Sequence, residues 1–86
     1  MANYKIFIKS SAAKELKRLP KTDVQRITSK IQSLSKEPRP QGCEKLSAQE
    51  RYRIRQGNYR IIYSIEDDKL TVYVVKIAHR KSVYKK

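Results

Sequence analysis

The chain has 86 residues and a formal net charge of +13 at pH 7, because 21 Lys and Arg residues outnumber 8 Asp and Glu residues. This length predicts a single domain, residues 1–86, with room for one modest core and one site. The single cysteine, Cys43, excludes an internal disulfide, and no Cys and His residues have the spacing of zinc ligands, so we expect a cytoplasmic protein without a metal or small-molecule cofactor. No apolar run approaches the roughly 18 residues of a membrane span, so we expect no membrane contact. The charge favours a polyanionic partner whose binding weakens as salt rises.

The first residues predict a strand followed by a short helix. Side chains alternate with a period of two, which is typical of a strand with one buried face, and the inward positions are Tyr4, Ile6 and Ile8. Ser10 or Ser11 is expected to cap a helix that Pro20 ends.

A second helix is predicted directly after this proline. Thr22 and Gln25 have the spacing of a capping box, and Pro38 prevents the helix from continuing. The apolar residues recur at helical spacing and give the two helices one shared seam; they are Val24, Ile27, Ile31 and Leu34. Residues 39–50 lack any periodicity, so a loop is predicted there.

Residues 52–63 predict a β-hairpin with an arginine-bearing face. If Gly57 and Asn58 form a two-residue turn, Arg55 lies directly opposite Arg60. The same register pairs Gln56 with Tyr59, Ile54 with Ile61, and Tyr52 with Tyr63. Like charges opposite one another destabilise a strand pair by roughly 0.2 to 1 kcal/mol, so folding alone gives no reason for the two arginines. Binding of an anionic ligand would give a reason for them.

A last strand is predicted over residues 69–78, which are apolar on both faces and therefore central in a sheet. If Asp67 and Asp68 form a second two-residue turn, Tyr73 opposes Ile62, Val75 opposes Arg60, and Tyr73, Val75, Ile77 and His79 share the arginine face. The predicted fold class is α+β: an N-terminal β-strand, a helical hairpin and a three-stranded antiparallel meander, with the helices on one face of a small four-stranded sheet.

Two segments are distinctive: the hairpin at residues 51–63, with Gly57-Asn58-Tyr59-Arg60 at its turn, and the terminal His79-Arg80-Lys81-Ser82-Val83-Tyr84. Together with the strand and the proline-bounded helices before them, these segments resemble the RelE/ParE superfamily of bacterial and archaeal toxins. The resemblance covers nearly the whole chain. It implies a RelE-like toxin of a type II toxin-antitoxin system.

The RelE branch cuts mRNA in the ribosomal A site and is silenced by a cognate antitoxin, so the resemblance implies an endoribonuclease with mRNA, the ribosome and an antitoxin as partners. ParE-like members instead poison DNA gyrase and do not need the terminal motif. A gyrase inhibitor without nuclease activity is therefore the alternative, and a basic nucleic-acid-binding module is a third possibility.

The chemistry that the resemblance implies is metal-free. The 2′-hydroxyl of the RNA attacks the adjacent phosphate and leaves a 2′,3′-cyclic phosphate. Guanidinium groups bind two phosphate oxygens at once and keep their proton, so Arg60 and Arg80 are predicted to stabilise the transition state. Arg53 and Arg55 are predicted to hold the RNA backbone, and further RNA contacts are predicted for Lys45, Arg51 and Lys81.

Proton transfer needs a different kind of side chain. RelE has lysines at the positions that match Arg53 and Arg55, and one of them is implicated in activating the 2′-hydroxyl, but an arginine is a poor proton acceptor. Tyr84 matches the terminal tyrosine of the family and is predicted to stack on a base or to exchange a proton. His79 is the only imidazole in the chain, and it is predicted as a general acid or base or else as a strand-end residue satisfied by hydrogen bonds.

Overall fold

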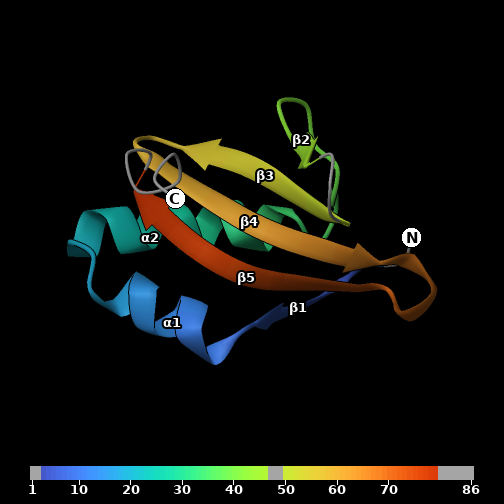
Figure 1. Ribbon diagram of the computed structural model, residues 1–86, viewed down its shortest axis with the longest axis horizontal. Helices are drawn as coiled ribbons and strands as arrows, with labels where there is room; N and C mark the ends of the chain where they lie inside the picture. The colour runs from blue at the N-terminus through green and yellow to red at the C-terminus, as the bar shows by residue number, and fades with distance from the viewer. Residues whose placement is uncertain (1–2, 47–49, 80–86) are drawn as a thin grey trace.

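The structure is a computed structural model that describes residues 3–46 and 50–79. Its elements follow one another as β1 (Lys5–Ile8), α1 (Ser10–Lys17), α2 (Lys21–Ser33), β2 (Glu44–Leu46), β3 (Arg51–Gln56), β4 (Tyr59–Glu66), a 3-10 turn η1 (Asp67–Lys69) and β5 (Thr71–His79). Both helices lie on the same side of a twisted sheet, and no described helix covers the other face, which we call the open face (Figure 1). No helix in the described part of the chain is long and apolar enough to cross a membrane.

The sheet has five strands in the order β1-β5-β4-β3-β2. β1 runs parallel to β5, and every other neighbouring pair is antiparallel. The α+β class, the helical hairpin and the antiparallel meander are therefore confirmed. The four-stranded count is wrong by one, because Glu44–Leu46 pairs with β3 and adds β2 at the edge, inside a segment predicted as a loop. Three residues are too few to show a strand period.

The β3–β4 hairpin has the predicted register. Gly57 has a φ of 60°, which fits the first position of a tight hairpin turn, where glycine is favoured. Arg55 pairs with Arg60 across the hairpin, and Tyr52 pairs with Tyr63. The predicted pairing of the two arginines is therefore confirmed.

The predicted register between β4 and β5 is wrong. The connection is longer than two residues: η1 is followed by Leu70 in the left-handed region, with a φ of 48°, and pairing begins at Glu66 and Thr71. The register shifts between Ile62 and Tyr63, so Val75 has no partner residue in β4. The observed pairs include Ser64 with Tyr73, Ile62 with Lys76, Arg60 with Ala78 and Tyr59 with His79. Ile77 and His79 consequently lie on the face opposite to the one expected.

The predicted helix caps are also absent. α1 has Lys9 at its N-cap and α2 has Pro20, and neither helix has a side-chain capping hydrogen bond. α2 begins at Lys21, so Thr22 lies inside the first turn and cannot act as its cap. Proline is well tolerated at a helix start because the first N–H groups have no partner within the helix.

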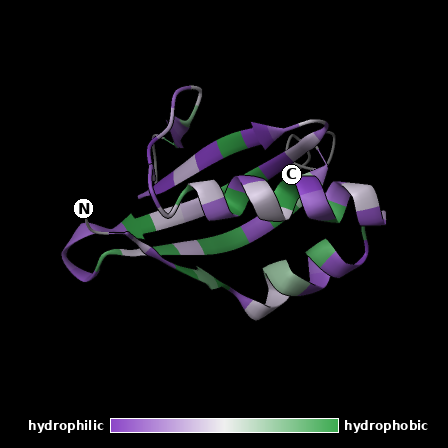
Figure 2. Ribbon diagram, turned by 180° about the vertical axis from the view of Figure 1, so that it is seen from behind, coloured by the Kyte–Doolittle hydropathy of each residue, from purple (hydrophilic) through white to green (hydrophobic). Residues whose placement is uncertain are grey.

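The core lies between the helices and the covered face of the sheet, where Figure 2 shows the hydrophobic residues of the strands beneath the helices. The helices contribute Ala12, Ile27, Ile31 and Leu34, and the sheet contributes Ile54, Ile61, Tyr63, Val72, Val74 and Ile77. Tyr63 is fully buried, and its hydroxyl donates a 2.8 Å hydrogen bond to the carbonyl of Pro38, which ties the segment after α2 to the sheet. Burial raises the pKa of the Tyr63 hydroxyl, so this donor keeps its proton.

Candidate functional site

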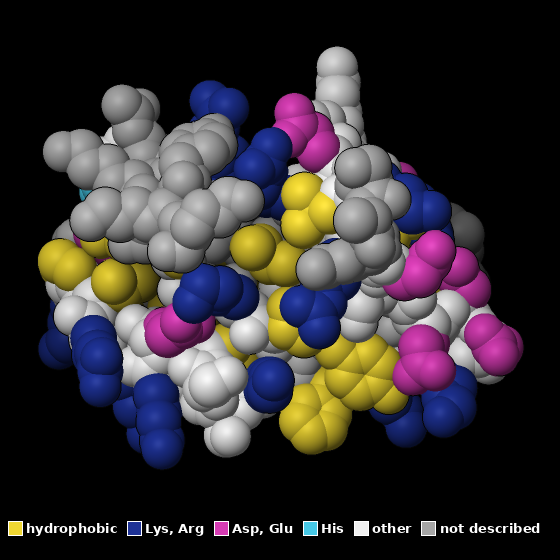
Figure 3. Space-filling model, viewed as in Figure 1, with side chains coloured by type: hydrophobic (Ala, Val, Ile, Leu, Met, Phe, Trp, Pro, Cys, Tyr) yellow, Lys and Arg dark blue, Asp and Glu magenta, His cyan; other side chains and the backbone are white. Residues whose placement is uncertain are grey.

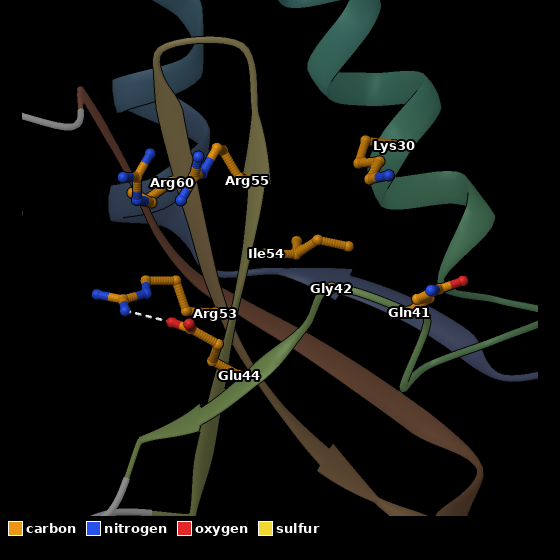
Figure 4. A pocket seen from close by; sticks show the side chains of 8 residues that line it. All are labelled: Lys30, Gln41, Gly42, Glu44, Arg53, Ile54, Arg55 and Arg60. Carbon is orange, nitrogen blue, oxygen red and sulfur yellow. Dashed lines mark hydrogen bonds and ion pairs between the residues drawn. The ribbon is translucent and has the colours of Figure 1, made fainter.

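Three arginines from the hairpin line one pocket of about 310 Å³ (Figure 4). Arg53 and Arg55 come from β3, and Arg60 comes from β4. The rest of the lining comes from α2, the segment after it, β2 and β3, through Lys30, Gln41, Gly42, Glu44 and Ile54. The pocket therefore gathers cations from segments that are far apart in sequence, as an anion-binding site requires.

Arg60 is the buried member of this group. It is 5% exposed and is the only buried charged side chain among the described residues. Its neighbours across the sheet are Arg55 on one side and Ala78 on the other, so the small alanine leaves room beside the long arginine. Desolvating a guanidinium costs free energy, so a buried arginine opposite a second cation is an unusual feature of a small sheet.

Arg53 is held by an acid. Its guanidinium forms an ion pair with the carboxylate of Glu44, which lies opposite it on β2. The hydrogen bond from Arg53 lowers the pKa of Glu44, so this carboxylate is ionised and is a weak proton acceptor. Glu44 therefore orients Arg53, and an incoming phosphate would compete with it for the guanidinium.

Two predicted RNA contacts lie outside the pocket. Lys45 pairs with Tyr52 in the β2–β3 ladder, and its ammonium lies 3.7 Å from the carboxylate of Glu50. Arg51 is exposed at the start of β3. Neither residue lines the pocket. Their role as RNA contacts stays a prediction.

His79 lies on the opposite face of the sheet from Arg53, Arg55 and Arg60. It lies on the helix-covered side of β5, where its ring makes an edge-to-face contact with Tyr59 at 5.5 Å between centroids and an angle of 84°. The Tyr59 hydroxyl in turn donates a 3.3 Å hydrogen bond to Asp23 of α2. Burial, followed by the nearby Asp23 carboxylate, raises the pKa of Tyr59. The expectation that His79 shares the arginine face was wrong, because it depended on the incorrect β4–β5 register.

Three further predicted residues, Arg80, Lys81 and Tyr84, lie outside the described residues.

No local pattern in the sequence predicts that Lys30 or the segment at Gln41 and Gly42 lines the pocket with the hairpin. Lys30 is half-buried and directly precedes Ile31 of the core, so helix packing carries it to the pocket wall. Gly42 adopts a φ of 93°, which favours glycine and turns the chain back toward β3. A lysine on a helix carries no local signal for such a contact, because the contact depends on how the helix docks.

Comparison with known proteins agrees with this architecture. The family model for the ParE toxin of the type II toxin-antitoxin system parDE matches residues 6–84. Comparison with curated protein sequences gives no significant match.

Several solved structures have the same fold. The toxin-antitoxin complex RelBE2 from Mycobacterium tuberculosis contains a chain with 26% identity and a TM-score of 0.83, over 93% of this chain and 94% of that one. The archaeal RelE-RelB complex from Pyrococcus horikoshii gives 30% identity and a TM-score of 0.82, over 91% of this chain and 96% of that one. The isolated E. coli RelE toxin gives 25% identity and a TM-score of 0.77, over 88% and 83%. The chain therefore belongs to the RelE/ParE superfamily of type II toxin-antitoxin toxins, and its fold is RelE-like.

Proposed function

We propose that this toxin is a ribosome-dependent endoribonuclease that cleaves mRNA and thereby inhibits translation. The observation that carries the proposal is the convergence of Arg53, Arg55 and Arg60 on one pocket, with Arg60 buried against another cation. The family model and the solved structures name two branches of one superfamily, so the choice between their activities depends on the site.

In this mechanism the three arginines take different parts. Arg60 lies deepest, so its orientation changes least when substrate enters, and it is the best placed of the three to stabilise charge that develops on the phosphorane. Arg55 is exposed and Arg53 is held by Glu44, which suits them to hold the RNA backbone on either side of the scissile phosphate. Arg80 remains the second proposed transition-state stabiliser.

Proton transfer falls to Tyr84 among the residues predicted from the sequence. Arginine does not give up its proton, Glu44 is a weak base and His79 faces the helices. A ribosomal group could also supply the base. Lys45, Arg51 and Lys81 are proposed to contact RNA at the margin of the site.

A cognate antitoxin is the proposed protein partner. The chains matched in the Mycobacterium tuberculosis and Pyrococcus horikoshii structures belong to toxin-antitoxin complexes. A surface with a net charge of +13 favours an antitoxin segment that carries acidic residues, because opposite charges speed association and exclude wrong partners.

The ParE family match makes gyrase inhibition the second candidate. Expression of the full chain in cells followed by ribosome profiling separates the two. We expect mRNAs cut at translated codons and stalled elongation, because the arginine pocket is directed at RNA. Intact mRNA and normal elongation, with gyrase-linked DNA breaks in their place, would assign the protein to the ParE activity.

A further inference from the structure

The open face of the sheet carries two aromatic rings away from the arginine pocket. Phe7 of β1 pairs with Tyr73 of β5, and their ring centroids are 5.7 Å apart with the planes inclined at 34°. Phe7 is 57% exposed, which is costly for a side chain that has no polar group. Neither ring belongs to the core that the helices cover.

Tyr73 has a fixed position in the sheet, because pairing with both β4 and β1 holds its backbone. Interaction with the Glu66 carboxylate raises the pKa of the Tyr73 hydroxyl. Phe7 lies on a short edge strand and has the larger exposed surface of the two. The pair therefore offers one fixed ring and one accessible ring, side by side.

The surroundings of the rings are basic. Figure 3 shows hydrophobic side chains on this face among Lys and Arg side chains, with acids in several places between them. The strand positions that share the face carry the acids Glu44 and Glu66 and the cations Lys5, Arg51, Arg53, Arg55, Arg60 and Lys76, the last of which is paired with Glu15. Glu44 is already paired with Arg53, so the net field still attracts an anion.

A single nucleic-acid strand whose phosphates bind the arginines can also reach the two rings. Tyr73 pairs with Ser64, and Arg60 lies four residues from Ser64 along β4. Strand geometry places Tyr73 and Arg60 about 14 Å apart, at roughly 3.4 Å per residue and 4.8 Å between strands. This span corresponds to about four nucleotides of a stacked single strand.

We propose that Phe7 and Tyr73 form a stacking platform for a nucleobase of single-stranded RNA whose phosphates lie on the arginine face. Exposed aromatic rings on an open sheet beside cations are the combination with which proteins bind unpaired RNA, because rings stack on bases and cations neutralise phosphates. The inference rests on the proposed RNA-directed function and adds a second contact to it, distant from the scissile phosphate. A protein surface docked on the rings is the competing explanation.

The chain contains no tryptophan, so Phe7→Trp in the full chain introduces a single fluorescent reporter at the platform. It is titrated with a single-stranded RNA of about six nucleotides, within the usual site size of such proteins. The matched probe is an oligonucleotide with the same phosphates and no bases. We expect the RNA to quench the indole fluorescence and the abasic strand to bind without quenching it.

Affinity provides the second readout. Phe7→Ala should weaken binding of the RNA by about 5- to 150-fold, the range for losing one stacked base, and leave the salt dependence of binding unchanged. Phe7→Tyr should restore the affinity. Leu70→Ala, which truncates another exposed apolar residue outside the strands, should have no effect on it.

Three results would overturn the platform. They are an unchanged RNA affinity in Phe7→Ala, equal quenching of the indole by the abasic strand, and no binding of the RNA by the wild-type chain. A change in sedimentation of Phe7→Ala without a change in RNA affinity would assign the rings to a protein contact and also overturns it. Cleavage on ribosomes is measured separately. Quenching by RNA in a chain that cuts no mRNA would leave the platform standing and remove the proposed activity.

Discussion

At the scale of single residues, the buried cation distinguishes this site from a generally basic surface. Most of the 21 Lys and Arg side chains keep a small protein in solution and need no further role. Arg60 differs because it is 5% exposed and lies opposite Arg55. Two cations opposite one another break a local rule of strand pairing, and such exceptions are expected at functional sites.

The first residue-scale prediction concerns this side chain. Arg60→Ala should slow single-turnover mRNA cleavage by roughly 100- to 1000-fold, the loss that follows removal of one preorganised transition-state donor. Arg60→Lys keeps the charge but loses the two-pronged hydrogen bonding, so its rate should be intermediate. The rate is measured at saturating toxin on programmed ribosomes, so weaker binding does not enter.

Arg18→Ala is the matched control, because it removes the same charge from the exposed end of α1. Thermal melting should show Arg60→Ala folded, since its loss removes a like-charge pair from the hairpin. A wild-type cleavage rate in folded Arg60→Ala would mean that the arginine only docks RNA.

At the scale of elements, an ion pair fastens the β4–β5 turn to the segment after α2. The Arg39 guanidinium donates to both carboxylate oxygens of Asp67, at 3.2 and 2.9 Å, and the Tyr4 hydroxyl donates to Asp67 at 2.7 Å. Arg39 also donates to the Tyr52 hydroxyl and lies over its ring, 5.2 Å from the centroid. The pair of Arg39 and Asp67 thus joins four segments of the chain.

These contacts predict an acid-dependent loss of stability. The hydrogen bonds from Arg39 and Tyr4 lower the pKa of Asp67 in the folded state. The charge of Asp67 therefore contributes fully to the free energy of unfolding above the ordinary aspartate pKa of about 3.9. This contribution is lost as the pH falls through the lower pKa of the folded state. Asp67→Asn should reduce the free energy of unfolding at pH 6 and have less effect at pH 2.5, as measured by urea denaturation.

Asp68→Asn changes the neighbouring exposed carboxylate of the same turn and serves as the control. The free energy of unfolding of Asp68→Asn should equal that of the wild type at both pH values. An equal loss at pH 6 and pH 2.5 in Asp67→Asn would show that its charge contributes nothing to the turn.

The elements also show how far the sequence predicts this fold. The hairpin register follows from Gly57 and Asn58, because a two-residue turn leaves one alignment of the flanking strands. The β4–β5 register does not follow from sequence, because it depends on the left-handed backbone at Leu70 and on the shift at Ile62 and Tyr63, neither of which has a residue signature.

The same limit applies to the candidate site. Arg53, Arg55 and Arg60 were predictable because they share one hairpin, whose periodicity places them on one face. Lys30 was not, because its position depends on helix docking. His79 was predicted on the wrong face because the register shift at Ile62 and Tyr63 reverses the faces of the β5 residues that follow Val75.

At the scale of the whole molecule, the two faces of the sheet have different roles. The helices cover one face and supply the core, and the open face is left to the arginines and the two aromatic rings (Figure 1). The net charge of +13 attracts polyanions over about a Debye length, and in the proposed function the pocket then binds an RNA phosphate. The superfamily fold is compatible with two targets, and the arginines of this face are the reason for proposing RNA.

Incubation of the purified full chain with programmed ribosomes and end-labelled mRNA, beside a gyrase supercoiling reaction, tests this account most directly. We predict cleavage within the codon in the A site, a 2′,3′-cyclic phosphate on the upstream fragment, and supercoiling at the rate of the reaction without toxin. Intact mRNA at saturating toxin, with gyrase inhibited in the parallel reaction, would contradict it.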